Sequence, residues 1–298
     1  MLRRSRLVPF FSSAVSVGLF CVGILVTGQL GWSQQPEAPA ETEAPDYRPA
    51  AHSYAADYKD FLSAARTEVA FVEESIRLAE SNGFRELTDQ SELRPGANLD
   101  RNNRGRALFL FVVGEEPFRD GFRITAAHID SPRLDLKARP IKTSSGFVQL
   151  QTMPHGGIKN YQWVNLPLAL VSRVYKKSGD MVPISIGLRA AEPVFIIPDL
   201  APHVDSSQRN RRSRDVVAGE EMDPIVYSWT SEAASNVAAN AKAHLTDVYG
   251  IDEPDLVSSE LHFVPALAPR DVGLDSELVG AYGQDDRSSA YAALRALI

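Results

Sequence analysis

The sequence predicts an α/β fold that carries a β-rich insertion, on three observations. Apolar residues recur at helical spacing between Tyr58 and Ile76. Two near-continuous apolar runs follow, at 107–113 and 122–127, and such runs are typical of strands in a sheet covered on both faces. After Lys137, short strand-like pieces alternate with Gly, Pro and Ser turns. A chain of 298 residues, 44% of them hydrophobic, has room for a sizeable core.

The first 33 residues are interpreted as a leader outside the fold. Arg3, Arg4 and Arg6 precede an uncharged run over 7–28, which is the pattern of a signal peptide. Because about 20 apolar residues span a bilayer, an uncleaved membrane anchor stays open as the alternative. Both alternatives predict an exported protein, periplasmic or extracellular. The only cysteine, Cys21, lies in the leader, so the exported part has neither a disulfide nor a thiol nucleophile.

The charge balance excludes one class of partner. The formal net charge is −7, and beyond the leader 28 basic side chains face 38 acidic ones. A nucleic-acid partner needs a basic footprint, so we expect none. The basic run 209–214 is the local exception and is interpreted as a solvated loop. Residues 34–50, rich in Pro, Glu and Ala, are predicted to form an extended tether.

The remaining elements are predicted from periodicity and from turn residues. The helix that starts near Tyr58 ends at Asn82-Gly83. A turn at 114–117 separates the two apolar strands. The elements predicted further along the chain are strands at 146–152, 168–176, 182–188 and 194–197, a mobile polar loop at 205–223, a helix at 231–249, a half-exposed strand at 260–264 and a helix from Ser288 to Ile298.

His128 ends the second apolar run, and Asp130 follows two positions later. Residues two apart on a strand share a face, so this carboxylate reaches the imidazole nitrogen that is not on a metal. Such a bond fixes the tautomer of the ring and raises its basicity as a ligand. A lone His-x-Asp is also typical of an ordinary semi-buried histidine, so the motif by itself leaves the metal site open.

An acidic cluster follows Gly283 far downstream. Asp285 and Asp286 precede a predicted helix, where adjacent carboxylates commonly serve as an N-cap and a first-turn charge. The functional alternative is that one carboxylate bridges two divalent ions about 3.5–4 Å apart. An imidazole and a carboxylate from neighbouring strand ends make half of a two-metal hydrolytic centre.

Three ordered blocks of the sequence are more specific than any of these motifs. They read AAHIDSPRLDLK at 126–137, HGGIKNYQWVNLPLAL at 155–170, and RDVGLD running into GAYGQDDR within 270–287, with shorter matches at 102–105 and 197–203. Together they resemble the aspartyl aminopeptidase and vacuolar aminopeptidase I family of dinuclear-zinc metallopeptidases. The resemblance runs from about Tyr58 to the last residue.

The resemblance implies a catalytic α/β/α sandwich, incomplete here, that is interrupted by a β-rich dimerisation domain. It implies that His128 ligates zinc, that Asp130 orients this ligand, and that Asp285 bridges two Zn²⁺ ions. The implied boundaries are 51–137 for the first catalytic part, 138–265 for the insertion and 266–298 for the second, truncated catalytic part.

Other histidines receive different interpretations. The resemblance implies that His203 reaches from the dimerisation domain into the site of a neighbouring subunit, where it binds the substrate carbonyl or the developing oxyanion. It thereby implies a homo-oligomer. The sequence alone places His203 in an ordinary loop. Surface or packing roles are assigned to the other histidines: His52, His155, His244 and His262. Of these four, only His155 is also considered as a residue lining a substrate path.

The chain departs from the family in what it lacks. Family members continue further and supply a Glu-Glu pair, whose first member is the general base, a further acidic ligand and a C-terminal histidine. We therefore expect a truncated or split product that is inactive alone, with the helix after Ser288 uncovered on its apolar face. Two hypotheses follow: an exported zinc aminopeptidase acting on peptides, which touches a membrane only if the leader is uncleaved, or a non-catalytic oligomerisation module or pseudoenzyme fragment.

Overall fold

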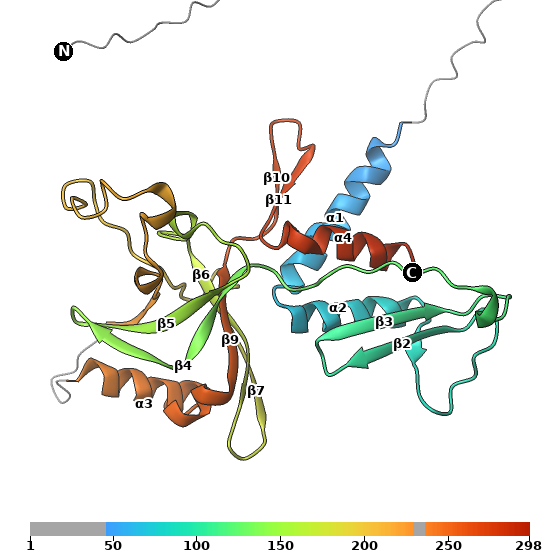
Figure 1. The fold of residues 1–298 in the computed structure, drawn as a ribbon, viewed down its shortest axis with the longest axis horizontal. Coiled ribbons are helices and arrows are strands. Elements are labelled where there is room, and N and C mark those ends of the chain that lie inside the picture. Colours follow the sequence, from blue (N-terminus) through green and yellow to red (C-terminus); the bar gives the residue numbers. More distant parts are fainter. Residues whose placement is uncertain (1–45, 229–235) are drawn as a thin grey trace, which may run out of the picture. The chain divides into compact units, whose positions relative to one another are not determined.

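A computed structural model describes residues 46–228 and 236–298, in which helices and strands both occur (Figure 1). The α/β class predicted from the sequence is therefore confirmed. The helices are α1 (Arg48–Ala64), α2 (Glu68–Ser81), α3 (Val237–Tyr249) and α4 (Gln284–Arg295), with 3-10 turns η1 (Phe118–Asp120), η2 (Asn160–Gln162), η3 (Ser213–Asp215), η4 (Gly219–Glu221) and η5 (Glu253–Ser258). The strands are β1 (Arg85–Glu86), β2 (Asn98–Asn103), β3 (Ala107–Val112), β4 (Arg133–Ser144), β5 (Phe147–His155), β6 (Leu168–Tyr175), β7 (Met181–Ile186), β8 (Ile225–Tyr227), β9 (Ser259–Pro265), β10 (Arg270–Val272) and β11 (Leu278–Gly280).

The predicted leader and residues 34–45 of the predicted tether lie outside the described residues. The last tether residues, 48–50, were predicted to be extended and instead form the start of α1. Within the described part of the chain, none of the helices is both long and apolar enough to cross a bilayer.

The apolar stripe from Tyr58 to Ile76 belongs to two helices rather than one. The chain breaks between Ala64 and Glu68, where the Thr67 side chain caps α2 by accepting a hydrogen bond from the Ala70 amide at 3.2 Å. The buried Arg66 guanidinium donates from this break to the backbone carbonyls of Pro265 and Leu267. The single-helix prediction was wrong because a distant contact fixes the break.

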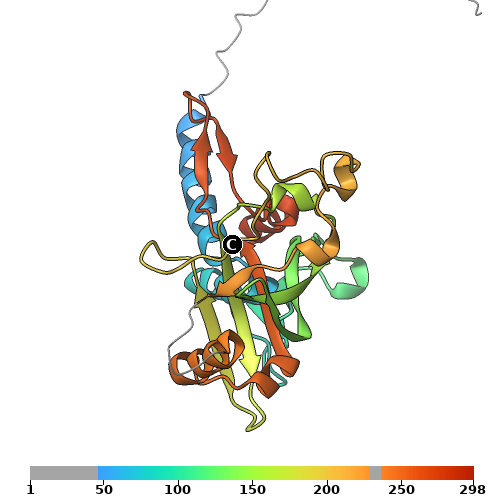
Figure 2. The same cartoon turned by 90° about the vertical axis from the view of Figure 1, so that its left-hand side faces the viewer.

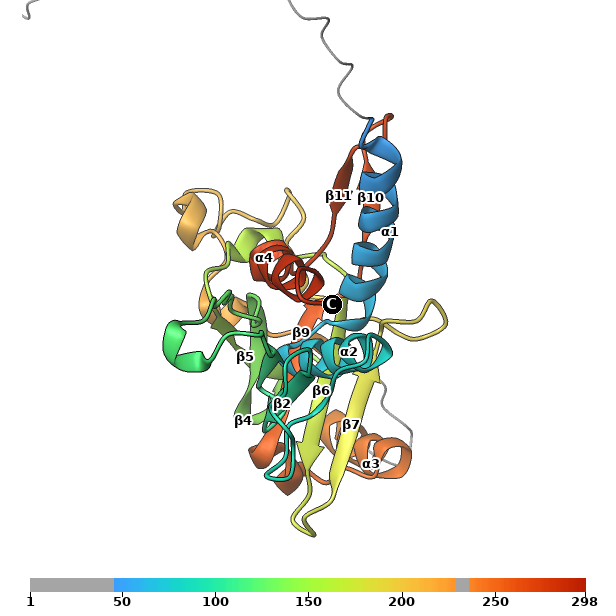
Figure 3. The ribbon, with the colours of Figure 1, turned by 90° about the vertical axis from the view of Figure 1, so that its right-hand side faces the viewer.

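Helix α4 packs against α1, and Figure 3 shows the two close together beside the β10–β11 hairpin. The ring of Tyr291 is 1% exposed and lies 5.0 Å from the ring of Tyr58 and 4.8 Å from that of Phe61, between centroids. Ala290 and Leu294 complete the buried face of α4. The expectation that this helix leaves its apolar face uncovered was therefore wrong.

A three-stranded sheet of order β1-β2-β3 follows α2. The strand predicted at 107–113 forms as β3, but Phe109 and Phe111 are exposed rather than buried. The second apolar run, 122–127, forms no strand, because within the described residues no neighbouring strand is hydrogen-bonded to it. His128 and Asp130 consequently sit on an extended segment that leads into β4.

The larger sheet has six antiparallel strands in the order β7-β6-β9-β4-β5-β8, and Figures 2 and 3 show β6, β7 and β9 side by side. Strand β9 lies between β6 and β4, so Leu261 to Val264 are buried and the half-exposed prediction was wrong. The segment 194–197, predicted as a strand, makes only isolated bridges. Strand β4 runs through residue 137, at which the sequence divides the domains, and that division stays a prediction.

The polar segment 205–223, predicted to be a mobile loop, is anchored to the rest of the fold near its C-terminal end. It contains η3 and η4, and Met222 is fully buried in the main core. The Asp223 carboxylate accepts hydrogen bonds from Lys142 Nζ at 2.8 Å and from the Thr152 amide at 3.0 Å, which fixes the segment to β4 and β5. The partners of these residues are far away in the sequence, so the polarity of the segment alone does not reveal the contacts.

Candidate metal centre

His128 and Asp130 contact one another, as the sequence predicts. The distance from His128 Nδ1 to Asp130 Oδ1 is 3.1 Å, which leaves the Nε2 atom of the imidazole directed elsewhere. The predicted reason, strand alternation, does not hold, because the segment has no strand partner. The contact is formed by the extended backbone leading into β4.

Asp285 lies on the other side of the same imidazole. Its Oδ1 atom is 3.3 Å from His128 Nε2, and Asp286 Oδ2 is 3.8 Å from that nitrogen. Gly283 precedes α4 in the left-handed conformation, with φ +88°, and the Asp285–Asp286 peptide bond is cis. Neither aspartate has helical dihedral angles, so the first turn of α4, to which both belong, is kinked at this pair.

A buried arginine holds this end of α4. Arg287, 1% exposed, donates from Nη1 to the Ser131 hydroxyl, and that hydroxyl donates to the Asp285 carbonyl at 2.7 Å. The guanidinium also lies over the Tyr282 ring, 5.7 Å from its centroid. Burial raises the pKa of Tyr282 to about 12, so its hydroxyl stays protonated. Ser131 and Arg287 thus join the His128 segment to the Asp285 loop.

Hydrogen bonds keep Asp130 ionised. The bond from His155 Nε2 to Asp130 Oδ2, at 2.9 Å, is the largest influence on this carboxyl and holds its pKa below the ordinary value. Partial burial works to lower the pKa of His128, but the bond to Asp130 and nearby carboxylates raise it overall. An ionised Asp130 is the state that accepts a hydrogen bond from each ring.

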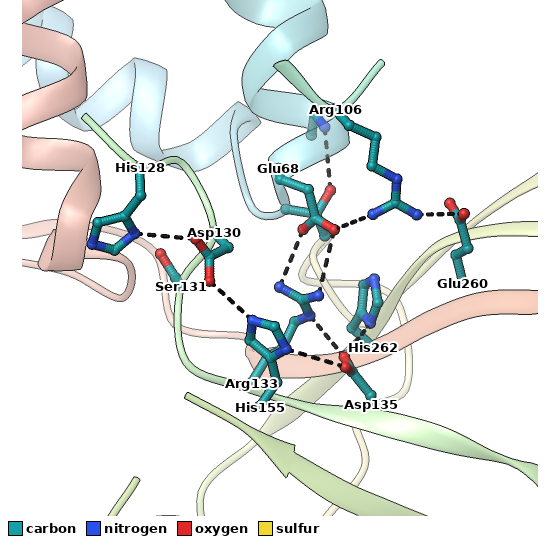
Figure 4. Close-up of polar contacts among 12 residues, drawn as sticks. Glu68, Arg106, His128, Asp130, Ser131, Arg133, Asp135, His155, Glu260 and His262 are labelled. Carbon is teal, nitrogen blue, oxygen red and sulfur yellow. Dashed lines mark hydrogen bonds and ion pairs between the residues drawn. The ribbon is translucent and has the colours of Figure 1, made fainter. Parts of the chain in front are cut away.

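His155 opens a second layer of contacts behind Asp130, drawn in Figure 4. Its Nδ1 atom lies 3.5 Å from Asp135 Oδ2, and Asp135 Oδ1 lies 2.6 Å from His262 Nδ1 and 2.7 Å from Arg133 Nε. The sequence missed this layer by assigning His155 and His262 to surface or packing roles. His262 is in fact buried against a carboxylate, and His155 joins two aspartates.

Strand register explains why these side chains meet. On β4, Arg133 and Asp135 are two residues apart and share a face. Arg133 pairs with His155 on β5, and Asp135 pairs with His262 on β9. The sequence alternation of Arg133 and Asp135 was visible, but the register that aligns three strands was not.

His203 is not part of this cluster. It lies in an exposed turn between η2 and η3, and no contact within the described residues joins it to His128 or Asp285. Its implied role requires a neighbouring subunit and stays a prediction.

The donor chemistry fits part of a zinc site. Two donors bound about 2.0–2.2 Å from a tetrahedral zinc ion lie roughly 3.3 Å apart, and His128 Nε2 and Asp285 Oδ1 have this separation, 3.3 Å. Imidazole nitrogen and carboxylate oxygen are both ordinary zinc ligands. Within the described residues, no group of three or more His, Cys, Asp or Glu side chains is arranged to hold an ion. These residues therefore provide two donors rather than a complete set.

Comparison with known proteins identifies the family of the chain. Residues 61–298 match the family described as aminopeptidase I zinc metalloprotease (M18). A probable M18 family aminopeptidase 1 of Clostridium acetobutylicum is 40% identical over 248 residues, which cover 81% of this chain and 53% of the relative. The chain thus spans about half the length of the curated relatives that it matches.

Solved structures have the same fold. The crystal structure of an M18 family aminopeptidase from Thermotoga maritima superposes with a TM-score of 0.80 at 37% identity, covering 84% of this chain and 55% of that one. The yeast mApe1 dodecamer, at 21% identity, has a TM-score of 0.62 and shows the fold alone; it covers 85% of this chain and 56% of that one. Sequence and fold together show that the chain belongs to the M18 family of aminopeptidase I zinc metalloproteases.

Proposed function

We propose that the protein is a zinc metallo-aminopeptidase that hydrolyses N-terminal residues from peptides. The observation that carries the proposal is the placement of His128 Nε2 and Asp285 Oδ1 at zinc-ligand separation, with Asp130 on the opposite nitrogen of the imidazole. Membership of the M18 family supports both the metal and the reaction class.

In the proposed site, each side chain has a defined task. His128 would hold zinc through Nε2, and Asp130 accepts a hydrogen bond from Nδ1–H, which selects the tautomer whose lone pair is on Nε2. Asp285 presents a carboxylate with two oxygens and is suited to bridge two ions. When bound, zinc lowers the pKa of a water ligand to about 7 and polarises the carbonyl under attack.

The number of ions and the activity of this chain alone belong to the proposal. A complete site holds two ions, each of which needs about four donors, and the described residues supply two donors in all. We therefore infer that these 298 residues bind zinc weakly and hydrolyse peptides only when further donors join the site.

Assembly and location are proposed on separate grounds. The β-rich segment 138–265 is proposed to pair subunits in a homo-oligomer, bringing His203 of one subunit toward the His128 site of another. Support comes from the dodecamer among the structural neighbours. Export is proposed from the basic start and the uncharged run over 7–28.

The test is zinc binding by the purified protein, with release of amino acids from peptides as a second readout. Purified protein would be incubated with aminoacyl chromogenic substrates and short peptides, with and without a chelator, alongside the His128→Ala variant. We expect wild-type protein to bind Zn²⁺ and His128→Ala to bind it at least about tenfold more weakly, as loss of a direct ligand requires. Release that the chelator leaves unchanged would reject the metal mechanism. Subunit association without any zinc binding would instead favour the non-catalytic module.

A further inference from the structure

His155 occupies an unusual place, because it is the link between two carboxylates. Its Nε2 atom lies 2.9 Å from Asp130 Oδ2, and its Nδ1 atom lies 3.5 Å from Asp135 Oδ2. One ring thus faces the His128 segment with one nitrogen and the six-stranded sheet with the other (Figure 4).

The two ends of this link differ in rigidity. Asp130 stands on the segment 121–132, which has no strand partner in the described structure, and its side chain is 46% exposed. His155 is the last residue of β5 and is paired in register with Arg133 of β4. An exposed aspartate on an unpaired segment loses rotamer freedom when it is fixed, so a second anchor is needed to hold one orientation.

Behind His155, the contacts become progressively more buried. Asp135 is held by Arg133 and His262, whose side chains are 7% and 6% exposed. Arg133 in turn pairs with the buried Glu68 of α2, with Nη1 and Oε2 3.2 Å apart. The carboxylate of Asp130 is therefore connected, through one imidazole, to a network whose other members have little freedom to move.

We propose that His155 is a positioning residue for Asp130: it fixes Oδ2 of that carboxylate so that Oδ1 faces Nδ1 of His128. Two histidines then hold one carboxylate, one on each oxygen. The proposal rests on the proposed function for the role of His128 as a ligand. The contact geometry by itself does not depend on zinc.

Two polar substitutions separate the two sides of the ring. In His155→Gln the side-chain amide nitrogen takes the place of Nε2 and keeps the donor to Asp130. In His155→Asn the amide takes the place of Nδ1, faces Asp135 and falls short of Asp130. If His155 acts only through Asp135, the Asn variant should behave like wild type. If His155 positions Asp130, the Gln variant should behave like wild type. His52→Phe, which removes an exposed imidazole of α1, is the matched control for histidine number.

The first readout is zinc affinity of the full chain, measured by competition with a chromophoric chelator. Losing a group that orients a ligand typically costs about 10- to 100-fold in metal affinity. Since His155 acts through Asp130, we expect His155→Asn to weaken binding by roughly 3- to 10-fold. His155→Gln and His52→Phe should stay within about twofold of wild type, and in an Asp130→Asn background His155→Asn should add no further loss.

The second readout does not need metal. Nitrogen-15 NMR of the imidazole rings at alkaline pH, where His128 is neutral, reports which nitrogen carries the proton. Wild type and His155→Gln should show His128 protonated at Nδ1, and His155→Asn should show a mixture of tautomers. Asp130→Ala is the positive control for this mixture, because it removes the acceptor of the hydrogen bond from Nδ1 of His128.

The outcomes distinguish this inference from the proposed function. If His155→Asn folds and matches wild type in both readouts while Asp130→Ala differs, His155 does not position Asp130. Equal losses in the two backgrounds, or a Gln variant that behaves like the Asn variant, lead to the same conclusion. If wild-type protein binds no zinc, the proposed function fails, and the tautomer measurement alone still decides the role of His155.

Discussion

At the scale of single residues, position 283 requires glycine for two reasons. Its φ of +88° lies in the left-handed region, and a Cβ there would collide with the buried Arg287 guanidinium. We expect Gly283→Ala to lower the free energy of unfolding by about 1–2 kcal/mol from the backbone alone. Displacement of Arg287 adds to this loss and weakens zinc binding, because Arg287 supports the Asp285 carbonyl through Ser131.

Urea unfolding of Gly283→Ala and of Gly114→Ala would test this. Gly114 is the matched control, since an added Cβ there meets nothing within 4 Å. Equal stability changes in the two variants would show that residue 283 tolerates a side chain.

Asp100 of β2 should give the free energy of unfolding an unusual dependence on pH. Its side chain is buried, and burial together with Glu80 and Glu86 raises its pKa above the ordinary value. The folded state therefore binds this proton more tightly than the unfolded chain, so stability falls as pH rises through the unfolded pKa, about 3.9, to the raised folded pKa. Asp100→Asn removes this loss.

The expected result for Asp100→Asn is a gain on the order of 1 kcal/mol at neutral pH, the size of an ordinary single-site effect. Below the pH at which Asp100 is protonated in both states, the difference from wild type should disappear. Thermal melts across pH measure it, with the exposed Asp89→Asn as control. A gain that persists in acid would point to a cause other than the carboxylate charge.

At the residue scale, the candidate site was only partly readable from sequence. His128 and Asp130 were predicted to touch, and they do, because two residues of separation bring their side chains within reach. His155 was missed because its neighbours come from strand register rather than from spacing. The residues next to His155 in the sequence, two glycines, do not indicate that it contacts two aspartates.

Among the elements, the contact between α1 and α4 sets the position of the Asp285 loop. Tyr291 is surrounded by the rings of Tyr54, Tyr58 and Phe61. Replacing a buried aromatic residue with alanine costs about 3–5 kcal/mol, from lost burial and the cavity that remains. We expect Tyr291→Ala to destabilise by that amount.

Chemical denaturation followed by circular dichroism gives the measurement for this element. Tyr47→Ala changes the same residue type where it is 71% exposed, and its effect should stay within about 0.5 kcal/mol. A comparable loss in both variants would mean that the ring cluster does not stabilise the α1–α4 contact.

Elements with strong local periodicity were predicted well, but the elements that pack against them were not. The strand 260–264 alternates, which suggested one exposed face, yet β9 lies between β6 and β4 and is buried. The helix break before Glu68 depends on carbonyls 199 and 201 residues away along the chain from Arg66. The apolar run 122–127 has strand composition, but pairing needs a neighbour that local sequence does not specify.

For the molecule as a whole, the family resemblance supplied what periodicity did not. The α/β class was predicted from periodicity and the family from motifs spread over 102–287, and both are confirmed. The network that ties α2 to the six-stranded sheet has no sequence signature. In this network Glu68 pairs with Arg133 and Arg106. Glu260 pairs with Arg106 and Arg173, so the network joins five separate segments of the chain.

Glu68 stands at the centre of this network and connects it to the site through Arg133. Its side chain is 7% exposed and faces the guanidinium groups of Arg133, at 3.2 Å, and Arg106, at 2.7 Å. Glu68→Gln keeps the shape of the side chain and removes the charge. Breaking a buried pair typically costs about 3–5 kcal/mol. Because Arg133 keeps Asp135 and Arg106 keeps Glu260 as partners, we expect a loss at the lower end, about 3 kcal/mol.

The control for Glu68→Gln is Glu74→Gln, further along α2, which removes the partner of the solvent-exposed Arg77. That solvent-screened surface pair should contribute little to stability and weaken further in 1 M salt, where the Debye length falls to about 3 Å. The loss in Glu68→Gln should persist in the same salt, because solvent ions do not reach the buried guanidinium of Arg133. Urea titrations at low and high salt separate the two cases. Equal salt sensitivity would place Glu68 among ordinary surface charges and remove the sheet-to-helix link through which the Asp135 and His155 contacts are anchored.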